Sequence, residues 1–316
     1  MKAITISQYG SPDVLDYGEV EKPQVTENEL LVRVKGSSVN PIDWKIREGQ
    51  LKILTGSKFP LYLGLDLSGV VEAVGEKVTR FQPGDEVYAS LTVNPKQKGT
   101  YGEYTTIAES LVAPKPSPLS YTEAATVPLA ALTALQGLKD KGKVQEGQRV
   151  LINGASGGVG SFAVQIAKAL GAQVTGVCST RNLDTVKSLG ADQVIDYTTT
   201  NFWQGSQRYD CVFDAVAMTS FWRCWRVLTP QGHYVTTLPM PDSLILGAIA
   251  QFLPFQKAEI IFYQANGQDL DILKGWIEKG QIRPLIDRTY PLSEIAAAHR
   301  HSESGHTVGK IALTVE

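Results

Sequence analysis

A glycine-rich turn at residues 154–160 is the feature of this sequence that points most directly to chemistry. An apolar run precedes it at residues 149–153, and apolar residues at helical spacing follow it up to Leu170. Glycines let the backbone bend tightly and let a pyrophosphate approach the main chain, while the first N–H groups of the helix supply donors. The strand, turn and helix together predict a dinucleotide site. The turn residues expected to bind the pyrophosphate are Gly154, Ser156, Gly157, Gly158, Val159 and Gly160.

The next apolar run, residues 173–178, ends without the acidic side chain that would bind the ribose 2′-hydroxyl of NAD. Ser179 and Arg181 follow it, and a hydroxyl with a guanidinium suits the additional 2′-phosphate of NADPH. Tyr197, just after the third run, offers a further hydroxyl. We therefore expect NADPH as the cofactor. The alternative is that Arg181 is a solvated residue near the start of a helix.

The alternation of apolar runs with helical patterns predicts the fold around this turn. From about residue 122, six runs alternate with helical segments, as expected for an α/β fold with a doubly wound parallel sheet of the Rossmann type. These runs are residues 149–153, 173–178, 193–196, 209–214, 233–237 and 259–263. The first third of the chain has the short β-branched runs of a β-rich domain, which a late strand at residues 308–315 rejoins. The predicted domains are residues 1–121 with 265–316, and residues 122–264.

Composition and charge exclude several classes of protein. Lys and Arg number 30 against 32 Asp and Glu, so nothing indicates the positive field of a nucleic-acid binder. Three isolated cysteines form neither a zinc-ligand pair nor a disulfide framework. The apolar stretch at residues 244–255 is too short to span a bilayer, but suits a pocket wall or a subunit contact. Because the N-terminal residues show no targeting pattern, we expect a cytoplasmic protein, for which peripheral membrane contact stays open.

Motifs over nearly the whole chain resemble those of the medium-chain dehydrogenase/reductases, and within that family the zinc-free quinone oxidoreductases and enone reductases. The glycine turn is one of these motifs. The others are residues 39–45 (VNPIDWK), 64–71 (GLDLSGVV), 74–85 (VGEKVTRFQPGD) and 124–134 (AATVPLAALTA). Within this group, the short runs at residues 40–45, 188–192 and 305–310 most resemble the chloroplast-envelope quinone oxidoreductase homologues.

The resemblance implies a GroES-like β domain beside the Rossmann domain, an active site in the cleft between them, and a homodimer formed through the nucleotide-binding domains. Zinc-dependent members of the family have cysteine at the position of Asn40 and histidine at that of Leu65, and four cysteines in the stretch that corresponds to residues 91–100. This sequence lacks those ligands, so we expect no metal. The resemblance also implies cofactor contacts from Thr133, Leu238 and Lys310.

The resemblance places residues 40–45 beside the nicotinamide, where hydride addition drives negative charge onto the substrate oxygen. Without a metal, hydrogen bonds must stabilise that charge. Lys45 offers a cation to the carbonyl or to the nicotinamide ribose, Asn40 offers an amide, and Asp43 can orient either. The alternative is an ordinary Asn-Pro turn followed by a surface Asp and Lys. We assign no general acid, because solvent can protonate the α-carbon; the tyrosine candidates are Tyr62, Tyr101 and Tyr263.

The sequence thus predicts a zinc-free, NADPH-dependent oxidoreductase that delivers hydride to an α,β-unsaturated ketone or aldehyde, or to a quinone. Its partner is a small hydrophobic carbonyl compound or quinone. Two alternatives stay open. One is an NADPH-binding protein without physiological turnover, as lens crystallins and partner-binding relatives suggest, and the other is a zinc alcohol dehydrogenase.

Overall fold

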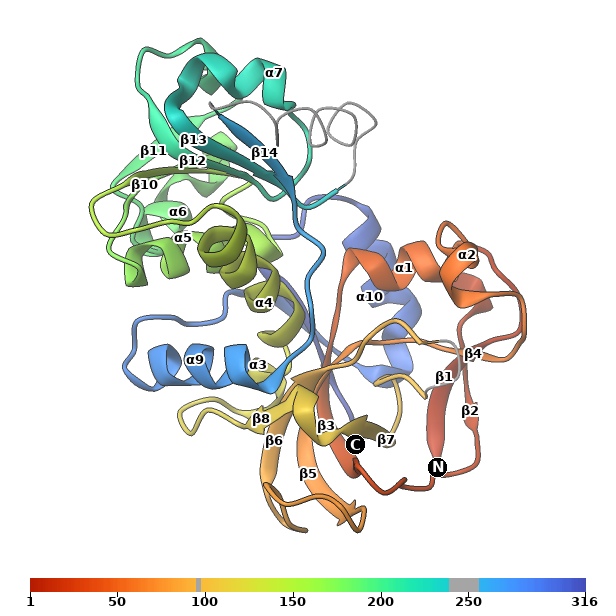
Figure 1. The fold of residues 1–316 in the computed structure, drawn as a ribbon. Helices are drawn as coiled ribbons and strands as arrows, with labels where there is room; N and C mark the ends of the chain where they lie inside the picture. Colours follow the sequence, from red (N-terminus) through yellow and green to blue (C-terminus); the bar gives the residue numbers. More distant parts are fainter. Residues whose placement is uncertain (95–97, 239–255) are drawn as a thin grey trace. The chain divides into compact units, whose positions relative to one another are not determined.

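A computed structural model describes residues 1–94, 98–238 and 256–316 of the chain (Figure 1). The apolar stretch at residues 244–255 lies outside these residues. The chain divides into two compact units. Unit 1 comprises Met1–Leu129, Gln264–Lys279 and Pro284–Glu316, and unit 2 comprises Ala130–Tyr263 and Gly280–Arg283.

A parallel sheet forms the centre of unit 2 (Figure 1). Its strands lie in the order β11-β10-β9-β12-β13-β14, and each is parallel to its neighbours. Their bounds are Arg149–Asn153 for β9, Gln173–Cys178 for β10, Gln193–Asp196 for β11, Tyr209–Asp214 for β12, Leu228–Thr236 for β13 and Lys257–Ile260 for β14. This order is that of a doubly wound dinucleotide-binding fold, which confirms the predicted Rossmann sheet. β13 and β14 begin earlier than the apolar runs indicated, because Leu228 and Lys257 already pair with the neighbouring strand.

Short connections and close packing hold the helices of unit 2 against this sheet. The helices are α4 (Pro128–Gln136), whose first two residues lie in unit 1, α5 (Gly158–Ala169), α6 (Leu183–Ser188) and α7 (Phe221–Cys224). α5 packs on β9 and β10 and buries Phe162 and Ile166. α6 approaches β10 closely at Gly176, where an added Cβ would lie 2.4 Å from the side chain of Val186. The glycine therefore allows helix and strand to pack at short range.

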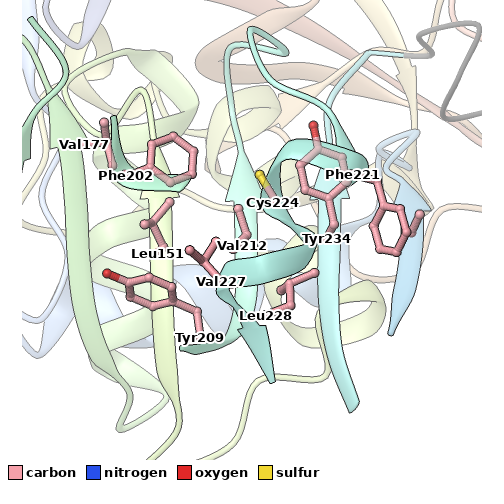
Figure 2. Close-up of a cluster of buried hydrophobic side chains, with 11 residues drawn as sticks. Leu151, Val177, Phe202, Tyr209, Val212, Phe221, Cys224, Val227, Leu228 and Tyr234 are labelled. Carbon is pink, nitrogen blue, oxygen red and sulfur yellow. The ribbon is translucent and has the colours of Figure 1, made fainter. Parts of the chain in front are cut away.

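Large apolar side chains fill one side of this sheet (Figure 2). They come from the strands and from α7 and its neighbouring turns. The members of the cluster are Leu151, Val177, Phe202, Tyr209, Val212, Phe221, Cys224, Val227, Leu228, Tyr234 and Ala258. Full burial of one such Val, Leu or Phe side chain contributes about 1.5–3 kcal/mol, so the cluster fixes the strands whose carboxyl ends carry the predicted cofactor site.

A mostly antiparallel sheet forms unit 1, in the order β15-β16-β3-β5-β6-β8, with β7 also paired to β3. The strands are β3 (Glu29–Val39), β5 (Asp66–Val74), β6 (Glu86–Ser90), β7 (Tyr104–Ala108), β8 (Val112–Pro114), β15 (Ile286–Pro291) and β16 (Lys310–Thr314). A smaller sheet contains β1 (Lys2–Ile6), β2 (Asp16–Glu19) and β4 (Leu61–Tyr62). β16 pairs antiparallel with β3, so the late strand rejoins the N-terminal unit.

The contacts of two short segments place the unit boundaries differently from the predicted domains. The helices of unit 1 are α1 (Pro41–Arg47), α2 (Lys52–Thr55), α3 (Tyr121–Ala124), α9 (Gly267–Glu278) and α10 (Ile295–Glu303). α3 packs on β3 and β5, so the segment that follows residue 121 stays with unit 1. Arg283 exchanges two hydrogen bonds with the side chain of Gln165, at 2.9 and 3.0 Å, which ties residues 280–283 to unit 2.

Within the described residues, no helix has the length and apolar character that crossing a membrane requires.

Candidate functional site

The turn between β9 and α5 needs glycine at two positions for reasons internal to the protein. Gly154 has φ +76°, and an added Cβ would lie 2.5 Å from the Val216 side chain. A Cβ on Gly160 would lie 2.0 Å from the carbonyl oxygen of Gly154. Gly157 is different, because a Cβ there would meet the same oxygen at an ordinary 3.5 Å. The space beside Gly157 is therefore open, as a bound phosphate requires.

The N-terminus of α5 supplies donors to that space. Gly157 is the residue that precedes the helix, and no side chain of the described residues hydrogen-bonds its cap position. The first-turn N–H groups of a helix have no partner within the helix, and the helix dipole adds a partial positive charge. The turn and the helix together fit a dinucleotide pyrophosphate.

The parallel sheet brings the other predicted cofactor residues of unit 2 to the same edge. Ser179, Tyr197 and Leu238 follow the carboxyl ends of β10, β11 and β13. Asn182, which the sequence analysis missed, donates from its Nδ2 to the hydroxyl oxygens of Ser156 at 3.0 Å and Ser179 at 3.3 Å. The sequence feature that could have identified Asn182 is its position just after the end of a strand. Asn182 thus ties the glycine turn to the end of β10.

Two further predicted cofactor residues belong to other elements. Thr133 is in α4, where it is buried, and Lys310 begins β16 in unit 1. The ammonium of Lys310 belongs to the polar cluster of unit 1 described below.

Asp196 is a charged group at this edge that the sequence analysis missed. It ends β11 and accepts hydrogen bonds from the hydroxyls of Thr180, at 2.6 Å, and Thr198, at 2.7 Å. These bonds, with that of Thr180 the largest, hold the pKa of Asp196 below its usual value. A carboxylate that stays ionised near the end of β10 opposes a second negative charge there, so Arg181 must offset it if a 2′-phosphate binds.

A buried carboxylate fixes the loop after β12. Asp214 accepts hydrogen bonds from Asn153 Nδ2 at 2.9 Å, from the N–H of Thr219 at 3.1 Å and from the Tyr234 hydroxyl at 3.0 Å. The loop between Asp214 and Thr219 contains Val216, the residue that abuts Gly154. Asp214 therefore holds that loop against the glycine turn.

A buried polar cluster occupies unit 1 at the start of α1. The Asp66 carboxylate accepts from the Ser38 hydroxyl at 2.7 Å, from Asn40 Nδ2 at 2.9 Å and from the N–H of Leu129 at 2.8 Å. Lys310 Nζ lies 3.6 Å from Asp66 Oδ2 and donates to Asn40 Oδ1. Asp66 is fully buried and Lys310 is 4% exposed, so each compensates the charge of the other.

Asp43 is the second buried carboxyl group in this cluster. Its Oδ2 accepts from the N–H of Asn40 at 2.7 Å and from the Tyr101 hydroxyl at 3.0 Å, whereas its Oδ1 has no hydrogen-bond partner in the described part of the chain. Burial, opposed by the bond from Asn40 and reinforced by the charge of Asp66, raises the pKa of Asp43 to about 7. The structure therefore brings Asn40 and Asp43 together, as the sequence analysis expected of neighbours on one segment.

Lys45 is on α1 like Asp43, but its side chain packs on Trp44 and not in the buried polar cluster. Its ammonium lies over the indole of Trp44, 5.5 Å from the ring centroid, and partial burial lowers its pKa. Among residues 1–94, 98–238 and 256–316, it makes no hydrogen bond to Asn40 or Asp43. Lys45 is therefore separate from the buried cluster.

Arg47 on α1 and His299 on α10 contact each other next to the buried polar cluster. Both are fully buried, and the Arg47 guanidinium contacts His299 Nδ1 at 3.2 Å, the carbonyl of Gly10 at 2.9 Å and the carboxylate of Glu303. The His299 ring packs edge-on against Tyr101. Burial, and then the charge of Arg47, lower the pKa of His299 to about 3, so the imidazole is neutral.

A recess in unit 1 has Asp43 in its wall. Six of its thirteen wall residues are aliphatic, namely Ile46, Leu61, Leu63, Leu65, Leu91 and Val93. The polar side chains of the wall, besides Asp43, are Thr55, Tyr62, Thr92 and Asn94. A recess that combines aliphatic and polar side chains is a candidate small-molecule site.

The positions that carry zinc ligands in the zinc-dependent relatives are Asn40, in the buried cluster, and Leu65, in the wall of the recess. Within the described part of the chain, no group of three or more His, Cys, Asp or Glu residues is placed to hold a metal ion.

Comparisons with known proteins agree with this architecture. The family model of the alcohol dehydrogenase GroES-like domain matches residues 26–117, which confirms the expected GroES-like domain, and the zinc-binding dehydrogenase model matches residues 189–313. The quinone oxidoreductase of Coxiella burnetii superposes with a TM-score of 0.91 at 33% identity, covering 100% of this chain and 99% of that chain.

Two curated relatives also match nearly the whole chain. The chloroplastic NADPH-dependent alkenal/one oxidoreductase of Arabidopsis thaliana is 35% identical over 99% of this chain and 79% of its own length. The chloroplastic quinone-oxidoreductase homologue of Spinacia oleracea is 34% identical over 99% of this chain and 98% of its own length. These relatives correct one prediction. Both are chloroplast proteins, which contradicts the expected cytoplasmic location.

Relatives at more than 30% identity thus match the chain along nearly its whole length, and the solved structure among them shares its fold. The chain therefore belongs to the medium-chain dehydrogenase/reductase family of oxidoreductases, in the group of the quinone oxidoreductases and the enone reductases.

Proposed function

We propose that this chain uses NADPH, without zinc, to reduce a carbon–carbon double bond conjugated to a carbonyl group, or a quinone. The observation that carries the proposal is the glycine turn at the carboxyl edge of the Rossmann sheet, with an open space at Gly157 and a helix N-terminus behind it. NADPH, when bound there, supplies a hydride. The relatives support the choice of substrate, since one is an alkenal/one oxidoreductase and others are quinone oxidoreductases by name.

The preference for NADPH rests on the end of β10. Ser179 and Arg181 stand where an acidic residue would bind the ribose of NAD, and Asn182 orients the Ser179 hydroxyl. An arginine binds a phosphate through paired, charge-assisted hydrogen bonds. In this proposal Arg181 and Ser179 bind the 2′-phosphate, and Tyr197 lies at the rim of that site.

The substrate would occupy the recess of unit 1. The aliphatic residues of its wall suit an apolar enone or quinone, and Asn40 donates its backbone N–H to Asp43, a residue of that wall. The Asn40 amide is oriented by Lys310 on its oxygen and by Asp66 on its nitrogen. In this role the second N–H of the amide donates to the substrate oxygen as negative charge develops.

Zinc plays no part in this reaction, because a side-chain amide and an alkyl group replace the ligands of the zinc-dependent relatives. The charge that zinc would stabilise is instead met by hydrogen bonds from Asn40. Prolonged dialysis against a chelator should therefore leave the rate of NADPH oxidation unchanged.

The test is steady-state oxidation of NADPH and NADH with a panel of enones, enals and quinones. We expect saturable turnover on at least one class, with a higher kcat/KM for NADPH than for NADH. Absence of turnover on every compound, together with tight NADPH binding, would favour the alternative of a binding protein. Loss of activity on chelation would favour a zinc enzyme.

We also propose a homodimer that forms through unit 2. In the described residues β14 is an edge strand, paired to β13 on one side. Edge strands present unpaired backbone groups that a second copy can extend. Light scattering should give twice the chain mass of 34.3 kDa.

A further inference from the structure

One buried amide of unit 2 contacts both segments that carry the predicted phosphate sites. Asn182 is 8% exposed, and its Nδ2 lies 3.0 Å from the hydroxyl oxygen of Ser156 and 3.3 Å from that of Ser179. Ser156 belongs to the glycine turn, and Ser179 follows the end of β10. Both serines are only partly buried, so a ligand can reach them, whereas Asn182 lies behind them.

The place of Asn182 in the chain indicates a different use for its side chain. It precedes α6, and an asparagine at this position commonly accepts a hydrogen bond from a backbone N–H of the first helical turn. The side chain of Asn182 makes no such bond. The turn before α6 is instead closed by the main chain, because the N–H of Asn182 donates to the carbonyl of Ser179 at 2.9 Å. The two contacts of the amide with the serines are therefore additional to what the local backbone requires.

The direction of these two hydrogen bonds determines what the serine hydroxyls can do. A hydroxyl group has one proton to donate and two lone pairs that accept. Because Asn182 donates to each hydroxyl oxygen, the protons of Ser156 and Ser179 stay available for another acceptor. A fully ionised phosphate group only accepts hydrogen bonds. The amide thus leaves both hydroxyls in the state that a phosphate ligand needs.

We infer that Asn182 is a positioning residue of the cofactor site, which directs the hydroxyl protons of Ser156 and Ser179 to the pyrophosphate and to the 2′-phosphate of NADPH, respectively. This rests on the proposed function. NADH carries the pyrophosphate but no 2′-phosphate. Asn182 therefore strengthens the binding of both cofactors through Ser156, and it strengthens the preference for NADPH through Ser179. It acts without contacting the cofactor itself.

Asn182→Ala tests this role through the Kd values of NADPH and NADH, measured by fluorescence titration. The net effect of one hydrogen bond corresponds to about threefold in affinity for each serine, so we expect a loss of about threefold for NADH and about tenfold for NADPH. Asn201→Ala is the matched control, because Asn201 is exposed and also precedes a helical turn without a side-chain bond to it. It should bind both cofactors like the wild type. A purely structural Asn182 would change the Tm but not the ratio of the two Kd values.

Double variants separate the two serines. In a Ser179→Ala background, Asn182→Ala should weaken NADPH and NADH equally, because only the contact through Ser156 is left to lose. In a Ser156→Ala background, the same change should weaken NADPH and leave NADH unaffected. A loss for NADPH in both backgrounds as large as in the otherwise unaltered chain would show that Asn182 acts through neither hydroxyl, and would overturn the inference.

Asn182→Asp supplies a test in a variant that keeps the helix cap. Aspartate is as favourable as asparagine before a helix, so the Tm should stay close to that of the wild type. Its carboxylate, however, only accepts, so it draws the protons of Ser156 and Ser179 away from the cofactor and adds a negative charge. We expect a larger loss of NADPH affinity than in Asn182→Ala, and wild-type affinity would contradict the inference.

The same titrations distinguish this inference from the proposed function. A wild type that prefers NADPH, together with an unaltered ratio of Kd values in Asn182→Ala, would refute the role of Asn182 alone. A wild type that binds neither NADPH nor NADH would refute the proposed function and the positioning role with it.

Discussion

Replacing Gly157 or Gly160 by alanine separates the two reasons for glycine in the dinucleotide turn. In Gly160→Ala the new Cβ would lie 2.0 Å from the Gly154 carbonyl oxygen, about 1 Å inside the closest approach of about 3.0 Å that real Cβ atoms show. Backbone must move, and overpacking of this kind costs about 1–3 kcal/mol. In Gly157→Ala the nearest atom is at 3.5 Å, so the protein itself accommodates the methyl group.

The two variants should therefore differ in stability and agree in cofactor binding. Gly157→Ala changes a residue at a helix cap, where alanine is worse than glycine by about 1 kcal/mol, and should lower the Tm by about 2–4 °C. Gly160→Ala should lower it by more. Both variants should raise the Kd for NADPH at least about tenfold, which corresponds to about 1.4 kcal/mol. In Gly157→Ala the reason is that the new methyl group occupies the space for the phosphate.

The assay is fluorescence titration with NADPH together with thermal unfolding of each variant. Gly275→Ala, in α9 and with nothing within 4 Å of the new Cβ, is the matched control and should bind NADPH like the wild type. Wild-type affinity in Gly157→Ala would refute the assignment of the phosphate to this turn. Wild-type stability in Gly160→Ala would refute the steric account of the turn.

Three further predictions concern ionisable groups. Arg181→Ala should weaken the binding of NADPH by about tenfold to a hundredfold and should change the binding of NADH little. The measurement is the ratio of the two Kd values, and equal losses of affinity for both cofactors would mean that Arg181 does not bind the 2′-phosphate. Lys310→Met should destabilise the chain by about 3–5 kcal/mol in urea unfolding, because Asp66 is left buried without its cation, and adding Asp66→Asn should recover part of the loss. His299 has a pKa of about 3 when folded and an ordinary value of 6.5, so the unfolded chain binds the extra proton between these values. The free energy of unfolding should therefore fall as the pH drops from 6.5 toward 3, and His299→Gln should flatten that fall.

The features that the sequence predicted well depend on neighbours in the chain. The strand, glycine turn and helix around residue 157 are local, because apolar periodicity and glycine spacing act within about twenty residues. The doubly wound parallel sheet followed from the alternation of strands and helices, because right-handed crossovers leave few arrangements. The location in the cell did not follow, and the prediction of a cytoplasmic protein is contradicted by the chloroplast relatives.

Local sequence patterns could not predict the polar cluster of unit 1. An acidic residue within the apolar run Leu65-Asp66-Leu67 was a signal for a buried carboxylate, but nothing in that run identified its cation. Lys310 meets Asn40 because β16 pairs with β3 across most of the chain. Tyr101 likewise reaches Asp43 from a different segment.

By itself the sequence determined the family, the Rossmann sheet and the place of the glycine turn between a strand and a helix, since these depend on short-range periodicity and on residue types at fixed spacing. Tertiary structure decided the state of the ionisable groups. Whether Asp43 holds a proton and whether Lys310 has a partner depend on burial and on charges contributed by distant segments. Electrostatic energies depend on distances in space and on the exclusion of water, and neither can be read from the order of the residues alone.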